Sequence, residues 1–164
     1  MNDRIHGDHP LIFNENLIEL NMEARDDKDA LYQLSQNFLK GNYVKETFPE
    51  ALIAREEEYP TGLLTNTLGI AIPHTNPNHV EKGSIGIGTL RTPVKFKAMA
   101  TGEEIDVSIL FMLAITHPSA QLIMLQKVME IIRDDKALLK IMESQSKEEI
   151  IQIVQPFLGE LVIS

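Results

Sequence analysis

The chain has 164 residues, no cysteine, and 24 acidic against 15 basic side chains, which gives a formal net charge of −9. This acidic balance argues against a protein that neutralises nucleic-acid phosphates or sits on an anionic membrane. The absence of cysteine excludes disulfides, thiolate metal ligands and a nucleophilic thiol within the chain.

The ends of the chain differ from its middle in composition. The first ten residues, MNDRIHGDHP, lack the apolar segment of a secretory signal, and no run approaches the roughly 18 apolar residues of a membrane span. We therefore expect a cytoplasmic protein without membrane insertion. Residues 1–10 would form a polar tail, 11–155 a single domain, and 156–164 an apolar C-terminal extension that packs on the core or on a second copy.

The N-terminal half predicts a strand followed by two helices. The apolar run 17–20 indicates the strand. Three-and-four spacing predicts a helix over 25–44, with Asp26 or Asp27 as its cap and Gly41 as its stop. A second helix is expected over 45–58, ending before Pro60.

The middle of the chain changes to strand patterns. The segments 68–75, 83–90 and 104–116 are apolar or alternating and are bounded by glycine and proline. The last is nearly continuous in apolar residues, as expected of a central strand covered on both faces. The glycines of GSIGIG (83–88) open no helix, so we expect a strand in close contact with another backbone rather than a dinucleotide site.

Helical spacing returns after this strand. A helix is expected over 119–134, with its inward face formed by Leu122, Leu125, Val128, Met129 and Ile132. Shorter helices are expected over 136–143 and 147–158. Because helices precede, interrupt and follow the strands, the pattern predicts an α/β domain in which helices layer a sheet.

Five histidines are candidates for chemistry. His6 and His9 are spaced as a ligand pair, but they lie in the polar tail, where no helix is expected. Because zinc needs three or four fixed ligands, we expect no metal site there. His79 lies in the loop NPNHVEKG and is interpreted as a solvated loop residue.

His74 differs because it ends the apolar run GIAIP, so a strand would deliver it to a sheet edge. Pro73 stiffens the entry to the following turn. A neutral imidazole is a competent nucleophile toward phosphorus, and its ordinary pKa near 6.5 leaves it mostly neutral in a cell. The alternative is a strand-end histidine that only caps a loop.

Arg55 precedes the turn YPTG at the end of the second predicted helix. Beside a phosphorylated histidine, its planar guanidinium would hold two phosphoryl oxygens. The alternative is a surface arginine that pairs with Glu56, Glu57 or Glu58.

The stretch REEEYPTGL (55–63) followed by GIAIPHT (69–75) resembles the enzyme IIA domains of the fructose/mannitol class of the bacterial phosphotransferase sugar-uptake system. The galactitol-type members are the most similar, and the resemblance extends from about residue 11 to 154. It implies a mixed β-sheet flanked by helices on both faces, and it makes 11–155 an enzyme IIA-like phosphocarrier domain.

The resemblance also implies roles for individual residues. His74 would be the phosphoacceptor and Arg55 would stabilise the phosphoryl group. Many members carry a second histidine, followed by leucine, at the start of the helix after the last core strand. Here Gln121 occupies that position and the nearest histidine is His117. Either Gln121 donates a hydrogen bond to the phosphoryl group or His117 reaches in from the loop, and Thr75 would add support directly after His74.

The implied activity is that of a phosphotransferase without metal or organic cofactor. The phosphoryl group would come from HPr and pass to a cysteine of an enzyme IIB, which in turn serves the membrane enzyme IIC. Galactitol or a related hexitol is the expected sugar, on the resemblance alone. Two alternatives remain: a regulatory protein of the same fold whose phosphorylation state controls a partner, and a non-catalytic interaction domain in which His74 is structural.

Overall fold

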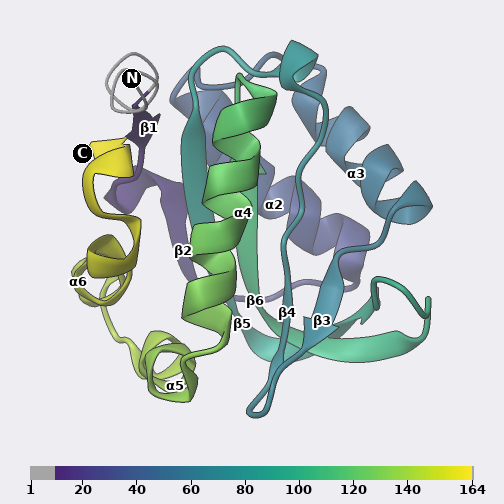
Figure 1. Ribbon diagram of the computed structural model, residues 1–164. Coiled ribbons are helices and arrows are strands. Elements are labelled where there is room, and N and C mark those ends of the chain that lie inside the picture. The colour runs from purple at the N-terminus through teal and green to yellow at the C-terminus, as the bar shows by residue number, and fades with distance from the viewer. Residues whose placement is uncertain (1–9, 164) are drawn as a thin grey trace.

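The computed structural model describes residues 10–163, which form a seven-stranded mixed sheet covered by helices (Figure 1). The strands are β1 (Leu11–Ile12), β2 (Ile18–Met22), β3 (Gly62–Leu64), β4 (Gly69–Ala71), β5 (Ser84–Lys97), β6 (Glu104–Ala114) and β7 (Val162–Ile163). Their order is β3-β4-β6-β5-β1-β7, and β2 also pairs with β5. The β3–β4 and β5–β6 pairs are antiparallel, whereas β4–β6 and the remaining pairs are parallel.

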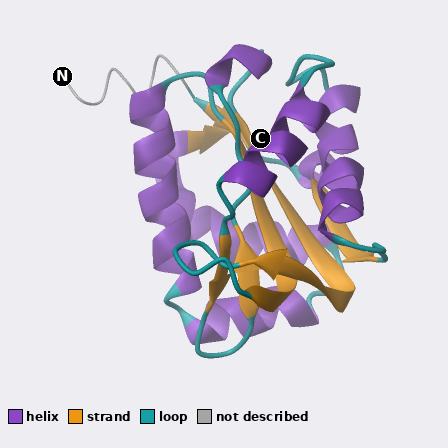
Figure 2. Ribbon diagram, turned by 90° about the vertical axis from the view of Figure 1, so that its right-hand side faces the viewer, coloured by secondary structure: helices purple, strands orange, loops and turns teal. Residues whose placement is uncertain are grey.

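Two groups of helices cover the two faces of this sheet. The helices are α2 (Asp27–Lys40), α3 (Phe48–Glu58), α4 (Pro118–Ile132), α5 (Asp135–Glu143) and α6 (Lys147–Leu158). Helices α2 and α3 lie behind the sheet in Figure 1 and α4 lies in front of it, and Figure 2 shows helices on both sides of the strands. The predicted α/β fold, a mixed sheet flanked by helices on both faces, is confirmed.

Strand β6 is the central strand that the apolar run predicted. Alternate side chains enter two separate cores: Ile109 and Phe111 pack with α4, α5 and α6, whereas Leu110 and Met112 pack with α2 and α3. All four are fully buried. Burial on both faces explains why this strand is apolar throughout rather than alternating.

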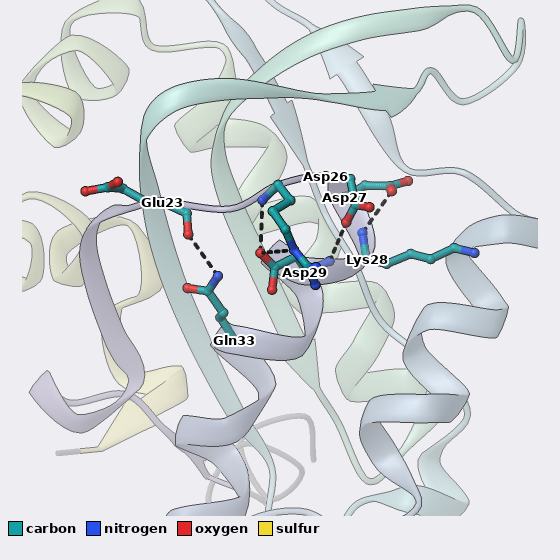
Figure 3. Close-up of polar contacts among 7 residues, drawn as sticks. Glu23, Asp26, Asp27, Lys28, Asp29 and Gln33 are labelled. Atoms are coloured by element: carbon teal, nitrogen blue, oxygen red, sulfur yellow. Dashed lines mark hydrogen bonds and ion pairs between the residues drawn. The ribbon is translucent and has the colours of Figure 1, made fainter.

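The start of α2 shows how the sequence sets a helix boundary (Figure 3). Asp26 has extended backbone angles, and its carboxylate accepts the Asp29 N–H at 2.8 Å, which makes it the N-cap. The Asp29 carboxylate in turn accepts the Arg25 N–H at 2.9 Å. Gly41 is the C-cap, as predicted.

The glycines of β5 provide the close contact that was expected. A Cβ added to Gly86 would lie 2.9 Å from the Leu17 carbonyl oxygen and 2.7 Å from Cε1 of Phe38. A side chain at this position would therefore separate β5 from the segment that leads into β2 and from α2.

The predicted inward face of α4 is partly wrong. Leu122 is 60% exposed, and the fully buried residues of the middle and end of the helix are Met124, Val128 and Ile131. Apolar residues occupy 122–125 without interruption, so the pattern could not show which of them faces the sheet. Packing in the core that α4 shares with the sheet, α5 and α6 selects Met124.

The short strands and the two ends of the chain were also only partly predicted. The short strands β1, β3 and β7 were not predicted. Helix α6 continues through Pro156, and the structure places Leu158, Leu161 and Val162 in the core, where β7 pairs with β1. The tail predicted over 1–10 lies, except for Pro10, outside the described residues. Within 10–163, no helix has the length and hydrophobicity needed to cross a bilayer.

Candidate active site

The segments that follow β4 and β6 meet at one edge of the sheet. These strands are parallel neighbours, so the segments that follow them leave the sheet in the same direction. The segment after β4 carries His74, which forms an isolated bridge with Leu113 of β6. The segment after β6 leads into α4, with His117 at its N-cap and Gln121 in its first turn. The topology thus places the segment that carries His74 and the start of α4 at the same edge of the sheet.

The His74 ring is half-buried and is held by its own backbone. Its Nδ1 atom lies 2.8 Å from the carbonyl oxygen of Ile72. Because a carbonyl oxygen only accepts hydrogen bonds, Nδ1 must carry the proton. In the neutral ring this leaves Nε2 with a free lone pair.

The surroundings of His74 keep the ring neutral. Burial lowers the pKa of His74 below its usual 6.5, the hydrogen bond to Ile72 raises it, and the positive charge of Arg55 lowers it. The net shift is downward, so the ring stays unprotonated through the neutral pH range.

Arg55 extends from the last turn of α3 into solvent and stacks on an aromatic ring. Its Cζ atom lies 4.2 Å from the centroid of the Tyr59 ring. Among residues 10–163, it forms no ion pair with the neighbouring glutamates. Glu57 instead pairs with Lys28 at 3.0 Å. The surface ion pair considered for Arg55 is therefore absent, and its donors are not occupied by a carboxylate.

The predicted supporting residues have different surroundings. Thr75 is buried, and its hydroxyl donates a long, 3.5 Å hydrogen bond to the Ala51 carbonyl of α3. Gln121 is half-buried, and within the described chain its buried Oε1 atom has no hydrogen-bond partner. His117 is half-buried at the N-cap of α4. Direct support of His74 by any of these three residues remains a prediction.

The remaining histidines lie apart from this chemistry. The Nδ1 atom of His79 is 2.8 Å from the Thr47 hydroxyl at the start of α3. His6 and His9 lie outside the described residues. In the part of the chain that the structure describes, no group of three or more histidine or acidic side chains is arranged to hold a metal ion.

Sequence patterns did not reveal two buried polar residues of this region, Glu56 and Thr61. Glu56 is 6% exposed, and its carboxylate oxygens accept the Thr61 N–H at 2.7 Å and the Thr61 hydroxyl at 2.9 Å. Glu56 stands in a run of three glutamates, and nothing in residue type distinguishes it from its exposed neighbours. The sequence feature that could have drawn attention to Glu56 is its position one residue after Arg55.

A family model confirms the resemblance carried by these motifs. The model described as phosphoenolpyruvate-dependent sugar phosphotransferase system, EIIA 2, matches residues 11–156. The chain belongs to this EIIA family. It is therefore, in general terms, a phosphotransfer protein of the sugar phosphotransferase system.

Known EIIA proteins agree with this assignment. The galactitol-specific EIIA component of Escherichia coli K12 is 32% identical over 101 residues, which are 62% of this chain and 67% of that protein. The E. coli mannitol enzyme IIA, solved in complex with phosphorylated enzyme IIB, has a TM-score of 0.72 at 19% identity, covering 87% of this chain and 98% of that one. The nitrogen regulatory protein IIA-Ntr of Neisseria meningitidis has a TM-score of 0.68 at 23% identity, covering 93% and 99%. At these identities the two structures support the fold.

Proposed function

We propose that this protein is a cytoplasmic phosphocarrier in which His74 accepts a phosphoryl group from HPr and passes it to a cysteine of an enzyme IIB. The sugar served would be galactitol or a related hexitol, as the similarity to the galactitol-specific EIIA suggests. The single observation that carries the proposal is the 2.8 Å contact between Nδ1 of His74 and the Ile72 carbonyl. It presents Nε2 as an unprotonated nucleophile, so the reaction needs no general base.

The transfer has two steps. In the first, the Nε2 lone pair attacks phosphorus, the N–P bond of the HPr phosphohistidine breaks, and the HPr imidazole leaves with the bonding electrons. In the second, a cysteine thiolate of enzyme IIB attacks the same phosphorus and His74 leaves. Both steps pass through a loose, in-line transition state, so positioning and charge stabilisation supply the catalysis. The Nδ1 hydrogen bond holds the ring throughout.

The oxygens of the phosphoryl group need donors. Arg55 is suited to this because its positive charge acts on the His74 ring, and among residues 10–163 it is not paired with a carboxylate. The first turn of α4 offers backbone N–H groups, and the amide of Gln121 would add a side-chain donor. The backbone N–H of Thr75 is a further candidate donor.

The surface beside the site suits protein partners. Tyr59 is 53% exposed and Leu122 is 60% exposed, one next to Arg55 and the other next to Gln121. Apolar side chains at this rim would help a docked partner to exclude water from the phosphohistidine. The net charge of −9 favours a basic carrier such as HPr. The complex of the related mannitol IIA with its IIB supports a IIB as acceptor.

The test is phosphorylation by phosphoenolpyruvate, enzyme I and HPr. We expect one acid-labile phosphate per chain, located on His74 by mass spectrometry under alkaline conditions. His74→Gln should abolish it, whereas His79→Gln serves as the control and should retain it. A His74→Gln protein that still takes up the phosphate would disprove the assignment. A folded wild-type chain that takes up none would favour a non-catalytic interaction domain.

The similarity to IIA-Ntr favours a second candidate, a regulatory protein whose phosphorylation state controls a partner. Both candidates accept phosphate on His74, so the growth of a deletion strain distinguishes them. Loss of growth on one hexitol supports transport. Broad defects on many nutrients, with normal growth on that hexitol, support regulation.

A further inference from the structure

Glu56 is the buried carboxylate that phosphoryl transfer does not itself use. It follows Arg55 on α3, yet it is 6% exposed, whereas Arg55 reaches solvent. Burial of a carboxylate is costly unless hydrogen bonds compensate for the lost hydration. Glu56 accepts such bonds from two donors, both on Thr61: the backbone N–H, and the hydroxyl, which lies within reach of both carboxylate oxygens. The chain thus maintains a buried acid one residue from the candidate phosphoryl-binding arginine.

Thr61 connects this carboxylate to the strand that carries His74. Its hydroxyl oxygen accepts the N–H of Ile72 at 3.0 Å, so the single hydroxyl proton is directed to Glu56. Thr61 is itself 7% exposed. When Glu56 is ionised, the direction of every bond in this part of the network is therefore determined by donor and acceptor chemistry.

Ile72 completes the connection to the imidazole. Its N–H donates to Thr61, and its carbonyl accepts the Nδ1–H of His74 at 2.8 Å. The next carbonyl, that of Pro73, accepts the Leu113 N–H at 3.0 Å, which ties the same segment to β6. The backbone that orients the His74 ring is thus held by β6 on one side and by the Glu56–Thr61 pair on the other.

We propose that Glu56 is a positioning residue for His74, acting through the Thr61 hydroxyl and the backbone of Ile72. The pair holds the Ile72 carbonyl where it accepts the Nδ1 proton, and so maintains the tautomer that leaves Nε2 unprotonated. The consequence for phosphoryl transfer rests on the proposed function, whereas the effect on the ring does not. Glu56 touches neither the imidazole nor the phosphoryl group.

The charges around Glu56 are consistent with a hydrogen-bonding role. Burial raises the pKa of Glu56 to about 7, the two bonds from Thr61 lower it, and the charge of Asp27 raises it. Lys28, Glu57 and Lys97 line the adjacent cavity together with Asp27. Lys28 is paired with Glu57 at 3.0 Å, and among residues 10–163 Glu56 itself forms no ion pair. Thr61 is therefore the main hydrogen-bonding partner of the Glu56 carboxylate.

The test compares Thr61→Val, which removes the hydroxyl at nearly constant volume, with Thr61→Ser, which keeps it. The primary readout is the ¹⁵N chemical shifts of His74 at pH 8 in the unphosphorylated full chain, assigned by their loss in His74→Gln. We expect wild type and Thr61→Ser to show a protonated Nδ1 and an unprotonated Nε2. Thr61→Val should show averaged shifts of two tautomers.

The second readout is the rate of phosphoryl transfer from HPr. We expect Thr61→Val to lower kcat on the order of 10- to 100-fold with little change in KM, because the network is buried and does not meet the partner. Thr61→Ser should retain most of the rate. A merely structural role would lower stability without changing the His74 tautomer.

The outcomes separate this inference from the proposed function. A folded Thr61→Val protein with wild-type His74 shifts would overturn the inference. If Thr61→Val does not fold, Glu56→Leu decides, because it removes both carboxylate oxygens that accept the Thr61 bonds. Unchanged His74 shifts in that variant would again overturn the inference. A wild-type chain that takes no phosphate from HPr would overturn the proposed function, and the shifts would still decide the inference.

Discussion

The guanidinium of Arg55 stacks on the ring of Tyr59, with 4.2 Å between Cζ and the ring centroid. The two residues lie one helical turn apart, across the end of α3, so the stacking follows from local sequence. A planar cation on an aromatic face keeps its in-plane N–H donors available. Tyr59 thus restrains the arginine without occupying the atoms that a phosphoryl group needs.

This relationship predicts that Tyr59 affects phosphoryl transfer through the aromatic ring rather than the hydroxyl. Tyr59→Ala should slow transfer from HPr about 2- to 5-fold, since a stacking contribution of roughly 0.5–1 kcal/mol is lost at an exposed site. Tyr59→Phe is the matched control and should stay near wild type. Rapid-quench measurement of transfer checks both, and equal rates in all three proteins would show that the stacking has no role.

Arg55 should also contribute, after burial, to the lowered pKa of His74. Its positive charge lowers that pKa, so Arg55→Gln should raise it toward the ordinary value, and Arg55→Lys should leave it closer to wild type. NMR titration of the His74 ring measures the shift. The same Gln variant should slow phosphoryl transfer, because a charged donor to the oxygens is lost. A His74 titration that is identical in Arg55→Gln would show that the charge of Arg55 does not act on the His74 ring.

Glu56 should make stability depend on pH in a particular direction. Its pKa is raised from 4.5 to about 7 on folding. Between these values the folded chain holds a proton that the unfolded chain has released, so this contribution to stability is present below pH 4.5 and is lost as the pH rises toward 7. The loss amounts to roughly 3 kcal/mol.

The measurement is urea unfolding of wild type and Glu56→Gln at pH 4.5, 6 and 8. The free energy of unfolding of wild type, relative to the variant, should fall as the pH rises. Taking the difference between the two proteins cancels the contributions that other groups make to the free energy of unfolding. One of these groups is His74, whose lowered pKa reduces stability as the pH falls below 6.5. A difference that stays constant from pH 4.5 to 8 would mean that Glu56 titrates normally.

The orientation of α4 predicts unequal effects for two apolar residues of the same turn. Met124 is fully buried and Leu122 is 60% exposed. Met124→Ala should lower the free energy of unfolding by about 2–5 kcal/mol, whereas Leu122→Ala should change it by less than about 0.5 kcal/mol. Denaturant unfolding checks both. Equal losses would mean that the helix is turned about its axis relative to the sheet.

Much of the fold and part of the site were predictable because the signals are local. The periods of 2 and 3.6 residues, the Asp26 cap and the Gly41 stop depend on neighbours in the chain, and they predicted the main helices and the long strands. The placement of His74 at the end of a strand, and the family to which the chain belongs, also follow from contiguous motifs. Family membership is now shown by the match over residues 11–156.

The parts of the fold and of the site that could not be predicted depend on residues that are distant in sequence. The pairing of β1 with β7 joins the two ends of the described chain, and the face that α4 presents is chosen by packing against the sheet. The Ile72 carbonyl fixes the proton of His74 on Nδ1. The N–H of Ile72 in turn donates to Thr61, whose hydroxyl donates to Glu56 on α3. The absence of cysteine, by contrast, is a property of sequence alone, and under the proposed function it requires the next phosphoryl acceptor to lie outside these 164 residues. Composition and local pattern thus determine which elements and reactive groups exist, whereas only long-range packing and hydrogen bonding decide which atoms meet.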